Sequence, residues 1–171
     1  QLGGLLKGAQ VAKKVADLNI SEGQEHEIGA QVSKAIRERY GVVQDPAVHR
    51  YVTLVGAALA VSSARPNIDW QFIVLDTDGV NAFAAPGGYV HITRGALALI
   101  KNEAELAGVL GHEVIHITEK HTISAIKKSK AKDLGTDLAP GGGLTKAALS
   151  KLADAATEAV LMGFGRGEEL E

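Results

Sequence analysis

The stretch "ELAGVLGHEVIHITEKH", residues 105–121, places two histidines and a glutamate inside an otherwise apolar segment. Leu, Val and Ile recur around these polar residues at the spacing of one helix face. Asn102, followed three residues later by Glu105, forms an N-terminal capping signature. We therefore predict a helix that begins near Asn102 and continues to about Lys130.

The spacing of His112 and His116 suits a metal ion. Residues four apart lie on the same helix face, so two imidazole nitrogens can reach one zinc ion. Glu113 is offset from His112 by about 100°, where its carboxylate can take a proton from water activated by the metal. His-Glu-x-x-His is a signature of zinc peptidases for these reasons. Two alternatives are a pair of core histidines held by backbone groups and a closed structural metal site, which would need four protein ligands and no base.

The third metal ligand is not identified by the motif itself. The continuation with a glycine and a third histidine is absent, and so is the inverted His-x-x-Glu-His order. His121 lies five positions after His116, so on a continuous helix it points away from the metal face. It is expected to lie on the helix surface or to contact a metal ligand without binding the metal itself. A carboxylate from a later helix remains, and the residues alone leave the choice open among Asp154, Glu158, Glu168, Glu169 and Glu171.

Composition limits the class of protein. The 171 residues suffice for one domain, and the net charge of −2 does not favour a nucleic-acid binder. The chain contains no cysteine, so a metal would be held by histidine and carboxylate side chains. No apolar run reaches the length of a membrane span. The chain begins with Gln1 and ends on the charged stretch "GEELE", so we expect residues 1–171 to be a single metallopeptidase domain truncated at both ends.

The remaining segments predict an α+β fold that is mostly helical. Residues 1–20 have weak helical periodicity, and capping signals predict further helices. The expected helices run from Ser21 to about Arg39 with a stop at Gly41, from Asp45 to about Ser62, and from Leu144 to about Met162. The expected extended segments are 68–76 and two pieces within 80–95, which flank a Pro86-Gly87-Gly88 turn. Residues 131–143 have the composition of a loop.

Three stretches, "NAFAAPGGYVHITRGAL", "NEAELAGVLGHEVIHITEKH" and "GFGRGEELE", resemble the CAAX-prenyl-protease and HtpX-like zinc metallopeptidases. The resemblance covers roughly Val43 to the last residue, and it is strongest to the soluble bacterial, BepA-like periplasmic branch. It implies a zincin-like domain with a small sheet, in which an edge strand flanks the His-Glu-x-x-His helix. The transmembrane helices of the integral-membrane branches have no counterpart in this sequence.

The resemblance also implies site residues. Members of this family take the third ligand from a Glu-x-x-Ala-Asp motif on a later helix, and "GRGEELE" aligns Glu169 with its first glutamate, although Glu168 is adjacent and the motif is incomplete. From the residues alone, the segment Tyr89 to Thr93 could equally be a plain interior strand. The resemblance favours an edge strand, which would bind an extended substrate by strand addition. The substrate-binding residues implied are Gly88, Tyr89, Val90, His91 and Ile92. The side chains of His91 and Arg94 are expected to be structural or to lie at the rim of the site, and not to bind the metal.

The sequence therefore predicts a zinc-dependent metalloendopeptidase with one zinc ion per chain. Its expected ligands are His112, His116 and Glu169, and Glu113 is the expected general base. The expected substrates are polypeptides, misfolded or of the cell envelope, and the expected location is the periplasm or envelope, with association to envelope proteins. The loop 131–143 is interpreted as a lid over the site, with a simple connecting loop as the alternative. The alternative function is a low-turnover, chaperone-like binding or assembly module on the same scaffold.

Overall fold

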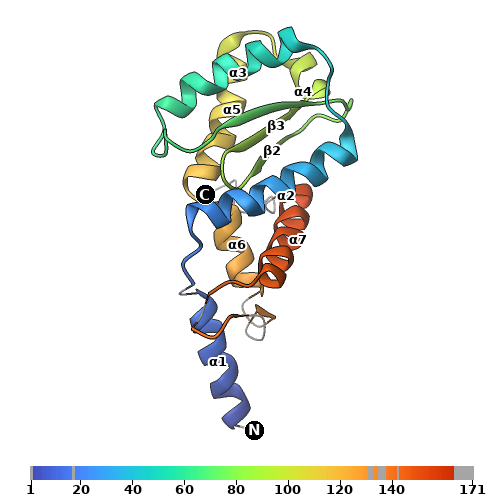
Figure 1. The fold of residues 1–171 in the computed structure, drawn as a ribbon. Helices are drawn as coiled ribbons and strands as arrows, with labels where there is room; N and C mark the ends of the chain where they lie inside the picture. Colours follow the sequence, from blue (N-terminus) through green and yellow to red (C-terminus); the bar gives the residue numbers. More distant parts are fainter. Residues whose placement is uncertain (1, 17, 131–132, 135–137, 142, 164–171) are drawn as a thin grey trace.

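The computed structural model describes residues 2–16, 18–130, 133–134, 138–141 and 143–163. Helices predominate in it, in the order α1 (Leu2–Ala16), α2 (Glu22–Tyr40), α3 (Pro46–Val61), α4 (Arg94–Leu99), α5 (Glu103–Thr118), α6 (His121–Lys130) and α7 (Lys146–Met162). Strands β1 (Gln71–Leu75), β2 (Ala82–Ala85) and β3 (Tyr89–Thr93) lie between α3 and α4. The α+β, mostly helical fold is confirmed (Figure 1).

Local signals set the ends of several helices. Ser21 and Gln24 form a reciprocal capping box at the start of α2, and Gly41 ends that helix with a φ of 74°. Asp45 accepts hydrogen bonds from two backbone amides at the start of α3, which has Pro46 in its first turn. Both helices therefore begin where the sequence predicts. The short helix α4, capped by Thr93, was not predicted.

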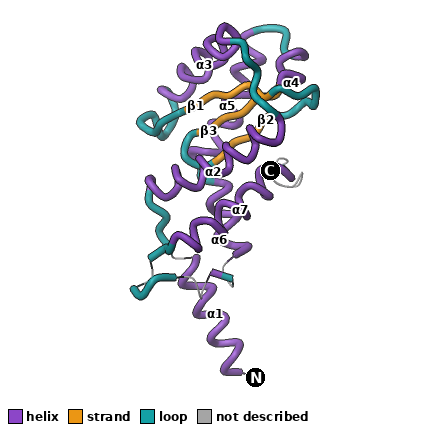
Figure 2. The backbone as a smooth tube through the Cα atoms, turned by 45° about the vertical axis from the view of Figure 1, so that its right-hand side comes forward, coloured by secondary structure: helices purple, strands orange, loops and turns teal. Residues whose placement is uncertain are grey.

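The sheet has the strand order β1-β3-β2, so β3 is its central strand. β3 pairs in parallel with β1 and antiparallel with β2. The tight turn between β2 and β3 requires glycine, because Gly87 and Gly88 have φ values of 83° and 109° and lie against neighbouring backbone. Figure 2 shows the three strands side by side among the helices, with α1 extending away from this part of the molecule.

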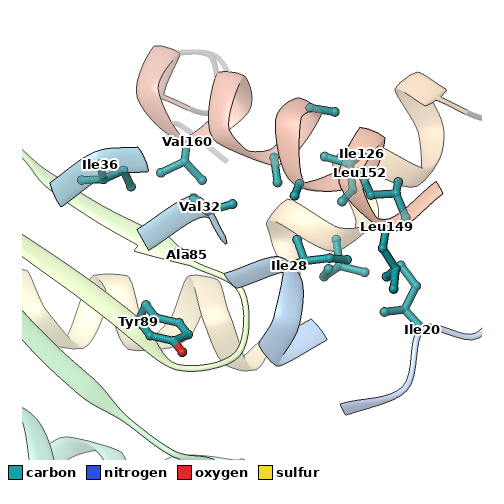
Figure 3. Close-up of a cluster of buried hydrophobic side chains, with 14 of the residues drawn as sticks. Ile20, Ile28, Val32, Ile36, Ala85, Tyr89, Ile126, Leu149, Leu152 and Val160 are labelled. Carbon is teal, nitrogen blue, oxygen red and sulfur yellow. The ribbon is translucent and has the colours of Figure 1, made fainter. Parts of the chain in front are cut away.

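Helices cover both faces of the sheet, and each face has its own core. Helices α3 and α5 pack on one face, where the buried side chains include Phe72, Val90, Leu106 and Leu110. Helices α2, α6 and α7 form the core on the other face, which includes Ile28, Tyr89, Ile126 and Leu152 (Figure 3). β3 lies between these two cores, and all five of its residues are buried. No helix within the described part of the chain has the length and apolar character needed to span a bilayer.

Candidate metal centre

Helix α5 presents its polar residues away from the core. Asn102 caps the helix and accepts a hydrogen bond from the Glu105 amide at 2.9 Å. The opposite face is buried against α3 and the sheet through Leu106, Leu110, Val114 and Ile117. His112 is exposed and Glu113 and His116 are half-buried. Ile115, one of the apolar residues next to the motif, does not help to bury the helix and is 57% exposed.

His112 and His116 converge through the same ring nitrogens. The Nε2 atoms of the two imidazoles lie 2.9 Å apart, and the rings meet edge to face. Two nitrogen ligands at the zinc–nitrogen distance of about 2.0–2.1 Å in a tetrahedral site are separated by about 3.3 Å. The observed pair is close to this separation, and imidazole is a preferred zinc ligand. The two histidines therefore fit a zinc ion.

The predicted single helix from Asn102 to Lys130 is wrong, because the helix breaks after Thr118. Lys120 has a φ of 53°, in the left-handed region, and α6 starts afresh at His121. The break turns His121 back toward the site instead of away from it. Its Nδ1 atom lies 2.7 Å from Nδ1 of His116, and the ring centroids are 4.9 Å apart. The expectation that His121 points away from the metal face therefore fails, because it assumed an unbroken helix.

A cleft of about 130 Å³ lies beside the histidine pair. Glu113 and His116 line it from α5, and Val160 and Gly163 line it from the end of α7. The remaining wall is Asn81 and the first three residues of β2, Ala82, Phe83 and Ala84. Within the described residues β2 is an edge strand, paired only with β3. An edge strand therefore flanks the His-Glu-x-x-His helix, as predicted, but this strand is β2.

The prediction that residues 88–92 form the substrate-binding edge is wrong. β3 is bonded to a strand on each side, so its backbone offers no free edge for an incoming peptide. The side chains of Tyr89, Val90, His91 and Ile92 are 6% exposed or less, and the Gly88 carbonyl accepts a hydrogen bond from Gln71. The error arises because strand order depends on non-local pairing, which the local pattern does not show.

His91 has a structural role, as its side chain was expected to have. Its Nε2 atom lies 2.9 Å from the Ser33 hydroxyl of α2, and its Nδ1 donates to the Phe83 carbonyl at 3.4 Å. Since a carbonyl can only accept, Nδ1 carries the proton and Nε2 accepts from Ser33. Burial lowers the pKa of His91 from 6.5 to about 4, so this imidazole is neutral. It joins β3 to α2 and does not face the cleft.

A buried ion pair next to the site was not predicted. The Glu25 side chain of α2 is 1% exposed and accepts two hydrogen bonds from Arg65, at 2.8 and 3.0 Å. Arg65 also donates to the Ile117 carbonyl at 3.3 Å, and Nζ of Lys120 lies 3.7 Å from Glu25. The hydrogen bonds from Arg65 to Glu25 raise the pKa of the guanidinium above its usual value. No local signal marks the pair, because its partners are 40 residues apart in sequence.

The predicted third ligand, Glu169, and its neighbour Glu168 lie outside the described residues. Within the described part, no group of three His, Asp or Glu side chains is arranged so that it could hold a metal ion, although the His121 ring contacts His116. The described chain ends at Gly163, which lines the same cleft as Glu113 and His116. The chain thus leaves α7 at the cleft, six positions before Glu169.

The lid interpretation of residues 131–143 is not supported by the described part of that loop. The loop joins the end of α6 to the start of α7, whereas the cleft is lined by the opposite end of α7 (Figure 1). A helix with the 17 residues of α7 is about 25 Å long. Leu134 is fully buried in the core, and Ala139 donates a hydrogen bond to the Gly143 carbonyl. The described residues of the loop thus lie far from the cleft.

Comparison with known proteins identifies the class. The model of peptidase family M48 matches residues 46–171, which include the histidine pair, Glu113 and the sheet. The chain therefore belongs to peptidase family M48. This agrees with the resemblance seen in the sequence.

Individual relatives include proteins named as proteases, one of them as a metalloendopeptidase. A protein of Vibrio cholerae is 28% identical over 155 residues, which are 90% of this chain and 32% of that protein. The beta-barrel assembly-enhancing protease of Escherichia coli is 29% identical over 112 residues, 66% of this chain and 23% of the relative. The mitochondrial metalloendopeptidase OMA1 of Arabidopsis thaliana is 38% identical over 72 residues, 42% of this chain and 15% of the relative. The chain thus spans a third or less of the length of each of these relatives.

Proposed function

We propose that this protein is a zinc-dependent metalloendopeptidase of the His-Glu-x-x-His type. The observation that carries the proposal is the convergence of the His112 and His116 Nε2 atoms, 2.9 Å apart, beside a cleft that Glu113 lines. A structural metal site would be closed by a further protein ligand, and it would have no use for a carboxylate in an adjoining cleft. Membership of a peptidase family supports the same function.

The ligands proposed for zinc are His112, His116 and Glu169. Since six residues of extended chain span up to about 20 Å, Glu169 is within reach of a cleft that Gly163 already lines. A bound zinc ion would polarise the carbonyl of the scissile peptide bond and increase the acidity of the attacking water.

Glu113 is the proposed general base. Its carboxylate would accept the proton of the attacking water and then deliver that proton to the amine that leaves when the peptide bond breaks. Glu113 adjoins His116 on one wall of the cleft, and β2 forms another wall. The backbone of a peptide bound in the cleft would therefore lie between the Glu113 carboxylate and the edge strand β2.

The proposed substrate is an extended polypeptide that adds to the free edge of β2. Strand addition recognises the peptide backbone, and it therefore accepts many sequences. The name of the Escherichia coli relative refers to the assembly of beta-barrels. By analogy, we propose misfolded or envelope proteins as substrates and the periplasm or envelope as the location.

Casein digestion with and without a metal chelator tests this function. Glu113→Gln should reduce cleavage by at least a factor of 10² to 10⁴, the usual contribution of a general base, while zinc content stays unchanged. Glu103→Gln is the matched control, since it makes the same substitution in the exposed first turn of α5. Cleavage that survives both the chelator and Glu113→Gln would refute the proposal. Casein binding without cleavage by the zinc-loaded protein would favour the binding-module alternative.

A further inference from the structure

Beyond the proposed ligands, the ring of His121 makes a specific contact with one of them. In His116 the Nε2 atom faces His112, and the Nδ1 atom on the other side of the ring lies 2.7 Å from Nδ1 of His121. A neutral imidazole carries its proton on one nitrogen only, so the partner of Nδ1 decides which nitrogen carries the proton and which carries the lone pair. If His121 accepts a hydrogen bond at Nδ1, His116 is protonated at Nδ1 and carries its lone pair on Nε2, the nitrogen that faces His112 and that would bind metal.

The break between α5 and α6 brings His121 into this position. On a continuous helix, a residue five positions later would be rotated by about 140° from His116. The left-handed conformation of Lys120 (φ 53°) removes that offset. A non-glycine residue in this conformation is strained, so neighbouring contacts must hold it.

The buried ion pair between Glu25 and Arg65 supplies those contacts. Arg65 donates to the Ile117 carbonyl in the last turn of α5, and Glu25 lies 3.7 Å from the ammonium group of Lys120. On the α6 side, Thr122 and Ile123 follow His121 directly and are 5% and 4% exposed. The backbone is thus fixed on both sides of His121, whose own side chain is exposed.

We propose that His121 is a positioning residue that accepts a hydrogen bond from Nδ1 of His116 and so directs the Nε2 lone pair of His116 toward the metal. The inference rests on the proposed function, because it takes His116 to be a zinc ligand. Hydrogen-bond partners of this kind typically contribute a factor of 10 to 100 in metal affinity. An acceptor at the place of the His121 Nδ1 atom is sufficient for this role.

Two variants of the 171-residue chain separate the hydrogen bond from mere packing. His121→Ala removes the acceptor and should weaken zinc binding by a factor of 10 to 100, measured by competition with a chelator of known affinity. His121→Asn places an amide oxygen close to the position of Nδ1 and should restore affinity to within about threefold of the wild type. Ser124→Ala, an exposed position on the same helix, is the control and should leave zinc affinity unchanged.

Imidazole nitrogen NMR on the metal-free protein gives a readout that does not depend on zinc. His116 should be protonated at Nδ1 in the wild type and in His121→Asn, and it should populate the other tautomer in His121→Ala. Three results would each overturn the inference. Zinc affinity could be equal in all variants, or it could fall equally in His121→Ala and His121→Asn. The third result is a His116 tautomer that does not change in His121→Ala. A wild-type chain that binds no zinc would instead refute the proposed function, and the tautomers would still decide the role of His121.

Discussion

His91 should make the folded protein sensitive to mild acid. Its pKa is about 4 in the folded state, compared with 6.5 for an ordinary histidine. Between these two values the unfolded chain binds more protons than the folded chain, so stability rises with pH across this window. The stability associated with neutral His91 is therefore complete above pH 6.5, and it is lost progressively as the pH falls toward 4.

The magnitude follows from the two pKa values. A difference of 2.5 units corresponds to a total of about 3 kcal/mol. Most of this, about 2 kcal/mol, should already be lost at pH 5. The cost is that of burying a charged imidazolium between β3 and α2, where the His91 side chain has no exposed surface.

Urea denaturation of the wild type and of His91→Gln at pH 7.5 and pH 5.0 tests this prediction. The half-buried Trp70 is the only tryptophan and reports unfolding by its fluorescence. Glutamine cannot gain a proton in this range, so its free energy of unfolding should fall by about 2 kcal/mol less than that of the wild type between the two pH values. The His91→Gln variant is expected to be less stable than the wild type at pH 7.5, but this difference cancels when the change in stability between the two pH values is compared. An equal fall in both proteins would show that His91 does not titrate as its burial implies.

Three further predictions concern the packing around the site and the substrate strand. Gly29→Ala should destabilise the protein by about 1–3 kcal/mol in a urea titration, because an added Cβ would clash with the Pro86 carbonyl in the turn before β3. Gly23→Ala on the same helix is the control and should not destabilise, because its Cβ would meet only Ser21 Oγ, at an ordinary contact distance of 3.9 Å. Arg65→Met should lower the free energy of unfolding by about 3–5 kcal/mol, because it leaves the Glu25 carboxylate buried without its main partner. Lys34→Met is the control, since it removes an exposed ion pair and should have no measurable effect on stability. The third prediction concerns substrates that add to the edge of β2. A peptide with one N-methylated amide beside the scissile bond loses one backbone hydrogen bond, so it should be cleaved about tenfold more slowly than the unmethylated peptide. Equal cleavage rates for the two peptides would exclude backbone pairing.

The sequence predicts those features of this fold that depend on near neighbours. The ends of α2 and α3 follow from capping side chains within three residues of the backbone they satisfy. The histidine pair follows from the helical repeat, since four positions separate His112 from His116. These are local relations, and the structure reproduces them.

The features that the sequence did not predict depend on distant contacts. Nothing in the five residues of β3 shows that strands will pair on both of its sides, which is why the central strand was taken for an edge. The break at Lys120 has neither glycine nor proline to mark it, and the nearby ion pair joins residues 40 apart in sequence. The contact between His116 and His121 depends on that break.

The zinc content of the purified chain tests the central claim most directly. After loading with zinc and removal of excess metal, we expect close to one zinc ion per wild-type chain. His116→Ala removes one of the two converging nitrogens and should abolish stable zinc binding. Glu169→Gln should weaken it strongly, if that carboxylate is the third ligand. A wild-type chain without zinc, or full zinc occupancy in His116→Ala, would contradict the account.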